Sequence, residues 1–118
     1  TGKVCPIGWH VPTKSDWDVL IEYVGSSPGN KLKESGTAHW KSPNSGASNS
    51  SGFTAVGSGY RNSANGMFQM KKGTNTWWTS TPKNDSNLET KAMWSNNSSV
   101  GGGNYNKSHG ASIRCLKD

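Results

Sequence analysis

The chain has 118 residues, 13 basic and 7 acidic side chains, two cysteines and six tryptophans. Leu, Ile, Val and Phe are too few for a leucine-rich helical bundle, and no apolar run approaches the roughly 18 residues of a membrane span. The 54 Ser, Asn, Gly and Thr residues indicate long loops, whereas a net charge of only +6 and six tryptophans argue against disorder. We predict one loop-rich domain with an aromatic core, residues 1–118, excised from a larger protein.

The N-terminal third begins with a strand-like run at residues 3–11, which its proline and glycine make irregular. A helix follows, with Thr13 as its N-cap, Asp16 as the capping-box partner and Gly25 as the C-terminal stop. Four residues at helical spacing form its apolar stripe: Trp17, Leu20, Ile21 and Val24. We expect this stripe to face the core.

Residues 26–51 are rich in Gly, Ser, Asn and Lys and are predicted to be irregular, anchored by Leu32 and Trp40. Further strand-like runs are expected at residues 53–56, 59–61, 67–70, 76–81, 88–95 and 111–116. Within TWWTST at residues 76–81, one of the two tryptophans must face the core and the other the opposite side. One helix, short strands and long loops predict an α+β domain.

Residues 96–109 (NNSSVGGGNYNKSH) are expected to form a polar, glycine-rich loop between the last two strands. If Met93 faces inward in the strand before this loop, Trp94 faces outward by strand alternation. Trp40 and one of Trp77 or Trp78 are predicted to be core residues. Arg61 is predicted to be a buried ion-pair or hydrogen-bond donor.

The two cysteines, Cys5 and Cys115, lie near the two ends of the chain. Two cysteines cannot form a zinc site alone, and their spacing matches no redox motif. We predict a disulfide bridge that ties the first strand to the last, and therefore an oxidising compartment.

The charged residues exclude several classes of partner. Seven carboxylates, none of them between residues 35 and 84, are a poor supply for a calcium site, so no metal or other cofactor is expected. The 11 lysines and two arginines are scattered, whereas nucleic-acid readers favour arginine forks and dense basic faces. No nucleic-acid partner is predicted.

Several segments together resemble one bacterial domain family, the Fibrobacter succinogenes major paralogous domain. They are CPIGWHVPT (5–13), DWDVL (16–20), KLK (31–33), SGFTAVGSGYR (51–61), WWTST (77–81) and GASIRCLKD (110–118), and they occur in the family's order. The resemblance implies a secreted or cell-surface location in Bacteroidetes, Fibrobacter or relatives. It also implies a reduced C-type-lectin-like fold, in which paired terminal strands close the domain and a long loop carries the ligand surface.

The chain departs from calcium-dependent lectins in two ways. It lacks their Glu-Pro-Asn or Gln-Pro-Asp tripeptide, and WSNN at residues 94–97 resembles their Trp-Asn-Asp motif only weakly. The catalytic cysteine pair of formylglycine-generating enzymes, which share the broad fold, is also absent.

No arrangement of residues indicates catalysis. The three histidines, His10, His39 and His109, have no nucleophilic serine and orienting acid placed beside them by the sequence. A glycosidase pair could come only from Asp85 and Glu89 or from helix carboxylates, which are expected to be solvated. We predict that the protein is not an enzyme.

Sugar sites combine a flat aromatic face with amide and hydroxyl groups. One late segment supplies such groups within 14 residues, and its candidate ligand-binding residues are Trp94, Asn96, Asn97, Asn104, Tyr105, Asn106 and Lys107. The alternative interpretation is a solvated loop in which the two aromatic residues cover a sheet edge.

These observations predict a monomeric, non-catalytic extracellular module that binds a glycan or a protein ligand through its late loop. The alternative is a structural, adhesin-type or pilus-type surface module without a small ligand. Residues 85–107 also have the Asn, Ser, Thr and Tyr content that diversity-generating retroelements produce in C-type-lectin-like domains. A hypervariable display scaffold is therefore a further hypothesis.

Overall fold

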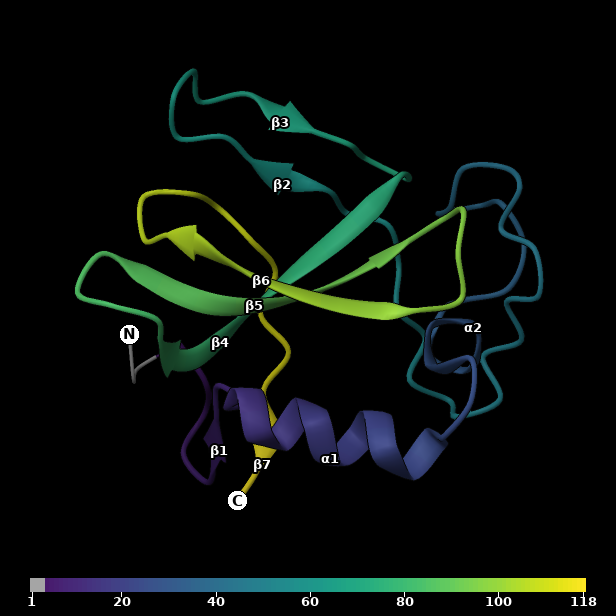
Figure 1. Ribbon diagram of the computed structural model, residues 1–118, viewed down its shortest axis with the longest axis horizontal. Coiled ribbons are helices and arrows are strands. Elements are labelled where there is room, and N and C mark those ends of the chain that lie inside the picture. Colours follow the sequence, from purple (N-terminus) through teal and green to yellow (C-terminus); the bar gives the residue numbers. More distant parts are fainter. Residues whose placement is uncertain (1–3) are drawn as a thin grey trace.

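The computed structural model describes residues 4–118 as a mixed α+β domain (Figure 1). Its elements in chain order are β1 (Trp9–His10), α1 (Lys14–Val24), α2 (Pro28–Leu32), β2 (Tyr60–Arg61), β3 (Phe68–Gln69), β4 (Thr74–Pro82), β5 (Asn87–Trp94), β6 (Val100–Asn106) and β7 (Leu116–Lys117). The strands pair antiparallel in three small sheets, β1–β7, β2–β3 and β4–β5–β6. The α+β class predicted from the sequence is confirmed.

Helix α1 begins and ends where its capping residues predict. The Thr13 hydroxyl accepts a hydrogen bond from the Asp16 amide at 3.0 Å, and the Asp16 carboxylate accepts one from the Thr13 amide at 2.9 Å. Gly25 ends the helix with a φ of 74°, which a residue without Cβ adopts readily. The apolar stripe packs on the central sheet through Trp17, Leu20 and Val24.

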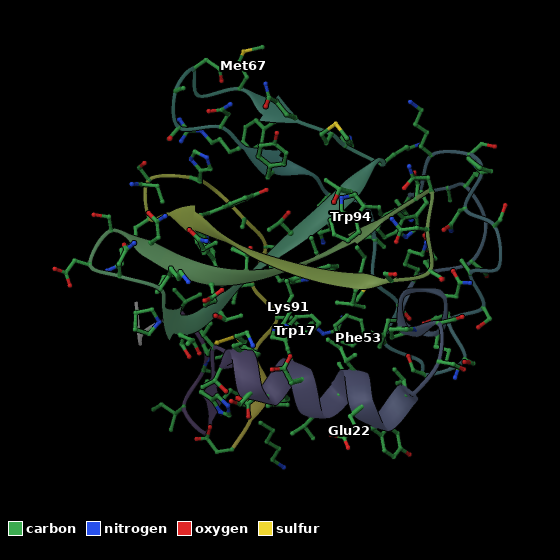
Figure 2. All side chains as sticks on the ribbon, viewed as in Figure 1. Trp17, Glu22, Phe53, Met67, Lys91 and Trp94 are labelled. Atoms are coloured by element: carbon green, nitrogen blue, oxygen red, sulfur yellow. A yellow bond between two sulfur atoms is a disulfide. The ribbon has the colours of Figure 1, made fainter. Side chains whose placement is uncertain are left out.

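The central sheet, β4–β5–β6, separates the molecule into two layers (Figure 1). On the side of α1, Trp77 and Met93 are buried, and the rings of Trp17 and Trp77 lie 5.5 Å apart. On the opposite side lies the β2–β3 hairpin (Figure 1). Strand alternation places Trp78 and Trp94 on this side too, and Figure 2 shows Trp94 there. The predicted division of the tryptophan pair between the two faces is confirmed.

The segment at residues 26–51 differs from its prediction by one short helix. Helix α2 has five residues, too few for a helical period to show in the sequence, and starts at Pro28, whose missing amide is harmless there. The expected anchors are confirmed, since Leu32 and Trp40 are fully buried. The Trp40 indole donates to the Ala55 carbonyl at 2.8 Å.

The expected loop at residues 96–109 is wrong in its centre, where β6 pairs with β5 over seven residues. This strand was not predicted because its three consecutive glycines have low strand propensity. One of them is required by the packing, because a Cβ on Gly101 would lie 2.4 Å from the ring of Trp94. The glycines therefore make room for Trp94 and are not a sign of a loop.

Other strand boundaries are shorter than predicted. The first strand was expected from Lys3, which lies outside the described residues, and within residues 4–11 only Trp9–His10 is paired. The run at 53–56 contributes one isolated bridge at Ala55, and the run at 111–116 is regular only from Leu116. The segment before Leu116 is held instead by single bridges to the β2 and β4 strands.

The two ends of the chain are joined as predicted. Strand β1 pairs with β7, and a disulfide links Cys5 to Cys115 over a sequence separation of 110. Figure 1 shows β1 and β7 close together near the start of α1. Among the helices formed by residues 4–118, none has the length and apolar character needed to cross a bilayer.

Candidate functional site

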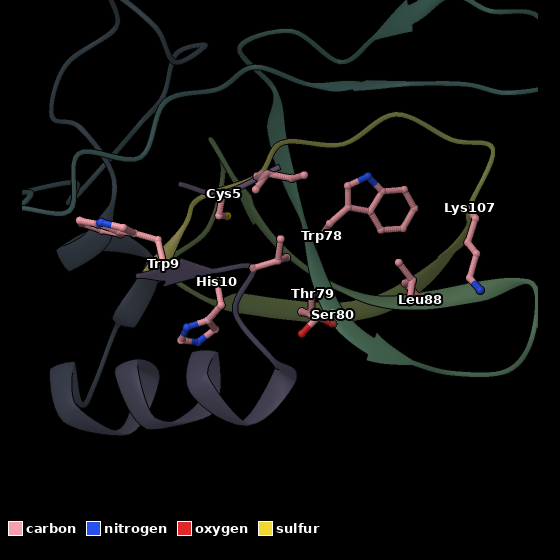
Figure 3. A pocket seen from close by; sticks show the side chains of 10 residues that line it. Cys5, Trp9, His10, Trp78, Thr79, Ser80, Leu88 and Lys107 are labelled. Atoms are coloured by element: carbon pink, nitrogen blue, oxygen red, sulfur yellow. The ribbon is translucent and has the colours of Figure 1, made fainter. Parts of the chain in front are cut away.

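A cavity of about 560 Å³ lies between the joined ends of the chain and the central sheet (Figure 3). Its lining residues come from β1, β4, β5 and the segments next to β6 and β7: Cys5, Trp9, His10, Val11, Trp78, Thr79, Ser80, Leu88, Lys107 and Ile113. This volume is in the range of small-molecule sites. We call it the terminal cavity.

Trp78 forms the aromatic wall of the terminal cavity. Its position in β4 places it on the sheet face opposite the core, and its indole extends toward Lys107 above Leu88 (Figure 3). The ring of Tyr105 meets it edge-on at 6.1 Å, which fixes the orientation of the indole. Within residues 4–118 the Trp78 indole N–H donates to no protein group, so it is available to a ligand.

His10 lies at the rim of the cavity between two carboxylates. Its Nδ1 is 2.6 Å from the carboxylate of Asp118, and its Nε2 is 3.1 Å from that of Asp16. The hydrogen bonds to Asp118 and then to Asp16 raise the pKa of His10 above its ordinary value. This arrangement neutralises the imidazolium within the protein and also links β1, β7 and the start of α1.

The polar side chains of the cavity differ in how far they are already used. The Thr79 hydroxyl donates to the Glu89 carbonyl at 2.8 Å, whereas the Ser80 hydroxyl makes no side-chain hydrogen bond in the described part of the chain. The Lys107 ammonium donates to the Asp85 carbonyl at 2.8 Å and lies at the far end of the cavity from Trp9 (Figure 3). The free groups are therefore hydroxyl, indole N–H and part of an exposed ammonium.

The seven residues predicted as one binding site are divided between the two ends of β6. Trp94, Asn96 and Asn97 lie at the turn between β5 and β6, whereas the Asn104–Lys107 group lies at the other end of β6. The strand residues 100–103 and the turn residues 98–99 lie between Asn97 and Asn104, and the strand part alone spans roughly 13 Å. The structure thus brings together two smaller groups and not one continuous site.

The group at the end of β6 borders the terminal cavity. Lys107 lines it, and Tyr105 packs against Trp78 and against Tyr60 and His109 at ring distances of 5.7 and 5.1 Å. Asn104 accepts a hydrogen bond from Asn87 at 2.7 Å, and Asn106 accepts hydrogen bonds from the Ser108 amide and hydroxyl. Tyr105 is half-buried in this aromatic cluster, and Asn104 and Asn106 are exposed.

The group at the β5–β6 turn is organised around Trp94. Its side chain lies on the face away from α1, as predicted, and covers Gly101 (Figure 2). Asn96 and Asn97 are exposed, and the Asn97 side chain accepts a hydrogen bond from the Ser99 amide at 3.0 Å, which shapes the turn.

Lys33 stabilises the β5–β6 turn, a role that the sequence analysis did not predict. Its side chain is fully buried, and its ammonium donates to the carbonyls of Trp94 at 2.7 Å and Asn97 at 3.0 Å. The ring of Trp40 lies 5.4 Å from the same nitrogen. Burial lowers the pKa of Lys33. No sequence signal marks this role, because a lysine among polar loop residues looks like a solvated one.

Two further sequence predictions concern Arg61 and metal binding. The prediction of a buried Arg61 is wrong, because Arg61 is exposed. Its backbone pairs with that of Gly110, but within residues 4–118 its guanidinium has no hydrogen bond or ion pair. In the same part of the chain, no three His, Cys, Asp or Glu side chains gather as a metal site would require.

The fold and the cavity define a small α+β domain that is closed by a disulfide and has an aromatic-walled cavity beside its joined termini. The sequence model of the Fibrobacter succinogenes major domain matches residues 1–117, almost the whole chain. The chain therefore belongs to the Fibrobacter succinogenes major domain family. No curated protein and no solved structure matches it.

Proposed function

We propose that this domain is a non-catalytic, extracellular or cell-surface recognition module that binds a glycan in the terminal cavity. The observation that carries the proposal is the indole of Trp78, which walls a cavity of about 560 Å³ with its N–H unpaired in the described chain. The C-type-lectin-like relationship is part of the same proposal. It is supported by the pairing of the terminal strands and by the disulfide between them.

The groups of the cavity suit a sugar better than an apolar ligand. An indole face stacks on the C–H face of a pyranose, while hydroxyl and N–H groups at its edge exchange hydrogen bonds with sugar hydroxyls. Trp78, Ser80 and Lys107 supply these groups on one wall, and Trp9 supplies a second aromatic ring at the opposite end. Because His10 is already paired with two carboxylates, its charge is not available to attract an anionic sugar.

An extracellular location is supported by the chemistry of the bridge. A disulfide that closes almost the whole chain persists only in an oxidising compartment. The absence of catalysis is proposed because His10, which lines the cavity, is bound by carboxylates on both ring nitrogens and so has no ring nitrogen left to activate a serine such as Ser80.

The proposal is tested by binding the oxidised domain to a glycan array, with and without chelator, and by repeating it with Trp9→Ala, Lys107→Ala and Trp94→Ala. We expect chelator-resistant binding that is lost in the first two variants and kept in the third. Loss confined to Trp94→Ala would move the site to the β5–β6 turn. Silence on the array would refute glycan binding.

The second candidate is a structural, adhesin-type or pilus-type module without a small ligand, in which residues 85–107 serve as a variable display surface. The observation that favours it is the exposure of large apolar side chains outside the terminal cavity, among them Ile7, Val19 and Tyr23. Concentration-dependent self-association in sedimentation experiments would support this candidate, and a monomer at all concentrations would not.

A further inference from the structure

The β2–β3 hairpin and the turn after it expose three apolar side chains close together in sequence. Met67, Phe68 and Met70 are 60%, 81% and 56% exposed. We call residues 60–72 the apolar hairpin. It lies on the face of the central sheet opposite α1, and Met67 projects from its outer end (Figures 1 and 2). An exposed group of large apolar side chains marks an interaction surface.

The same hairpin is basic and has no acidic neighbours in the sequence. Arg61, Lys71 and Lys72 are exposed, and residues 35–84 contain no Asp or Glu. In the ladder Arg61 lies directly opposite Phe68, so the two side chains leave the same face of the hairpin. None of the three cations forms an ion pair within residues 4–118. The hairpin thus carries positive charge that no protein group neutralises.

The backbone keeps two of these side chains in place against a conformational preference. Met70 and Lys72 have φ values of 59° and 65°, in the left-handed region that favours Gly or Asn. A residue with a Cβ loses about 1–2 kcal/mol there. A sequence selected for stability alone would place Gly or Asn at both positions, whereas this one places an apolar and a cationic side chain.

A second cavity, of about 270 Å³, lies at the base of the apolar hairpin. It is lined by Tyr60, Arg61 and Phe68 and by the hydroxyl-bearing Ser58 and Ser112. The Arg61 guanidinium, the Ser58 hydroxyl and an aromatic edge can hold a phosphate whose apolar continuation lies along Phe68, whereas the Ser112 hydroxyl already donates to Asn75 Oδ1 at 2.8 Å.

We infer that the apolar hairpin docks on an anionic lipid surface. Met67, Phe68 and Met70 enter the interface between headgroups and acyl chains, while Arg61, Lys71 and Lys72 contact lipid phosphates. An acidic protein would satisfy the cations but would leave three unbranched or aromatic apolar side chains without a defined pocket, so a lipid surface fits both halves of the hairpin. In this orientation α1 and β7 lie on the side of the molecule away from the membrane (Figure 1).

The test is cosedimentation of the oxidised 118-residue chain with vesicles at low ionic strength. One set of vesicles contains phosphatidylglycerol in phosphatidylcholine, and the other contains phosphatidylcholine alone. We expect binding to the first set only. Phe68→Glu should weaken it about tenfold or more, and replacing Lys71 and Lys72 by Gln should weaken it about fivefold per lysine.

The matched control is Tyr23→Glu. Tyr23 is an aromatic residue 86% exposed on α1, on the opposite side of the molecule, so this variant makes the same charge change away from the hairpin. We expect its binding to equal that of the unmodified chain. Circular dichroism verifies that both variants are folded.

Three outcomes would overturn the inference. The first is no binding to the anionic vesicles, and the second is an equal loss in Phe68→Glu and Tyr23→Glu. The third is a protein that does not bind vesicles but binds soluble polyglutamate, with the same affinity in the Phe68→Glu variant. That result would assign the cations to an acidic macromolecule.

Discussion

The buried ammonium of Lys33 provides the sharpest test of how the β5–β6 turn is held. Lys33→Met keeps an unbranched side chain of similar length and removes the charge. The carbonyls of Trp94 and Asn97, which now accept hydrogen bonds at 2.7 and 3.0 Å, lose their donor. The variant thus separates the hydrogen bonds of Lys33 from its packing.

The expected loss follows from the number of hydrogen bonds and from the burial of the ion. A hydrogen bond from a charged donor contributes about 1.5–3 kcal/mol, and two are lost. Methionine avoids the cost of burying an ammonium, which offsets part of that loss. We expect the free energy of unfolding to fall by about 2–4 kcal/mol, a large share of the stability of a small domain.

The assay is urea unfolding followed by tryptophan fluorescence, with hydrogen exchange of residues 95–99 as a local readout. Lys31→Met is the control, because the Lys31 ammonium donates to a single carbonyl, that of Val24, at 2.7 Å in a half-buried setting. Its loss should be about 1 kcal/mol, below the range for a buried charged donor, because water can replace this single hydrogen bond at a half-buried site. Equal losses in the two variants, with unchanged exchange at the turn, would show that Lys33 does not hold it.

Three further predictions concern stability. Reduction of the Cys5–Cys115 bridge should destabilise the domain by roughly 4–5 kcal/mol, and an unchanged melting temperature with reductant would contradict this. Since the folded-state pKa of His10 is raised, the stability it contributes is full below its unfolded pKa of about 6.5 and is lost as pH rises through the folded value. Melting temperatures from about pH 5 to 9 should show this loss, and His10→Gln should remove it. Gly101→Ala should destabilise the domain by about 1–3 kcal/mol, because the new Cβ displaces the Trp94 ring. Gly102→Ala should cost far less, because its Cβ would lie 3.5 Å from the nearest atom, the Thr90 carbonyl oxygen. Equal melting temperatures in the two variants would refute the packing argument.

Local signals predicted the parts of the fold that depend on neighbouring residues. Helix α1 was predicted from signals that lie within a few turns of chain. They are the capping pair at Thr13 and Asp16 and the apolar stripe that begins at Trp17. The division of Trp77 and Trp78 between two faces needs only strand alternation. The bridge between the cysteines follows because each has only one possible partner in the chain.

Strand β6 and the terminal cavity could not be predicted in this way, because both depend on residues far apart in sequence. Three consecutive glycines are typical of a loop, and only the packing of Trp94 over Gly101 explains why they occur in a strand. The predicted ligand residues at 94–107 are close in sequence, yet an intervening strand carries the two groups to opposite ends of the sheet. Conversely, Trp9 and Lys107 are 98 positions apart and line one cavity.

The bridge between the ends also determines how the domain responds to tension. A force that pulls on the chain outside Cys5 and Cys115 passes from one residue to the other through the sulfur atoms, across a Cα–Cα distance of 5.8 Å. The folded segment between them carries none of this load. With the bridge open, the same 110-residue separation could extend to roughly 360–400 Å. Oxidised, the domain is a link of nearly fixed length in whatever chain contains it, and its folded surfaces keep their shape under a pull that would otherwise unravel them.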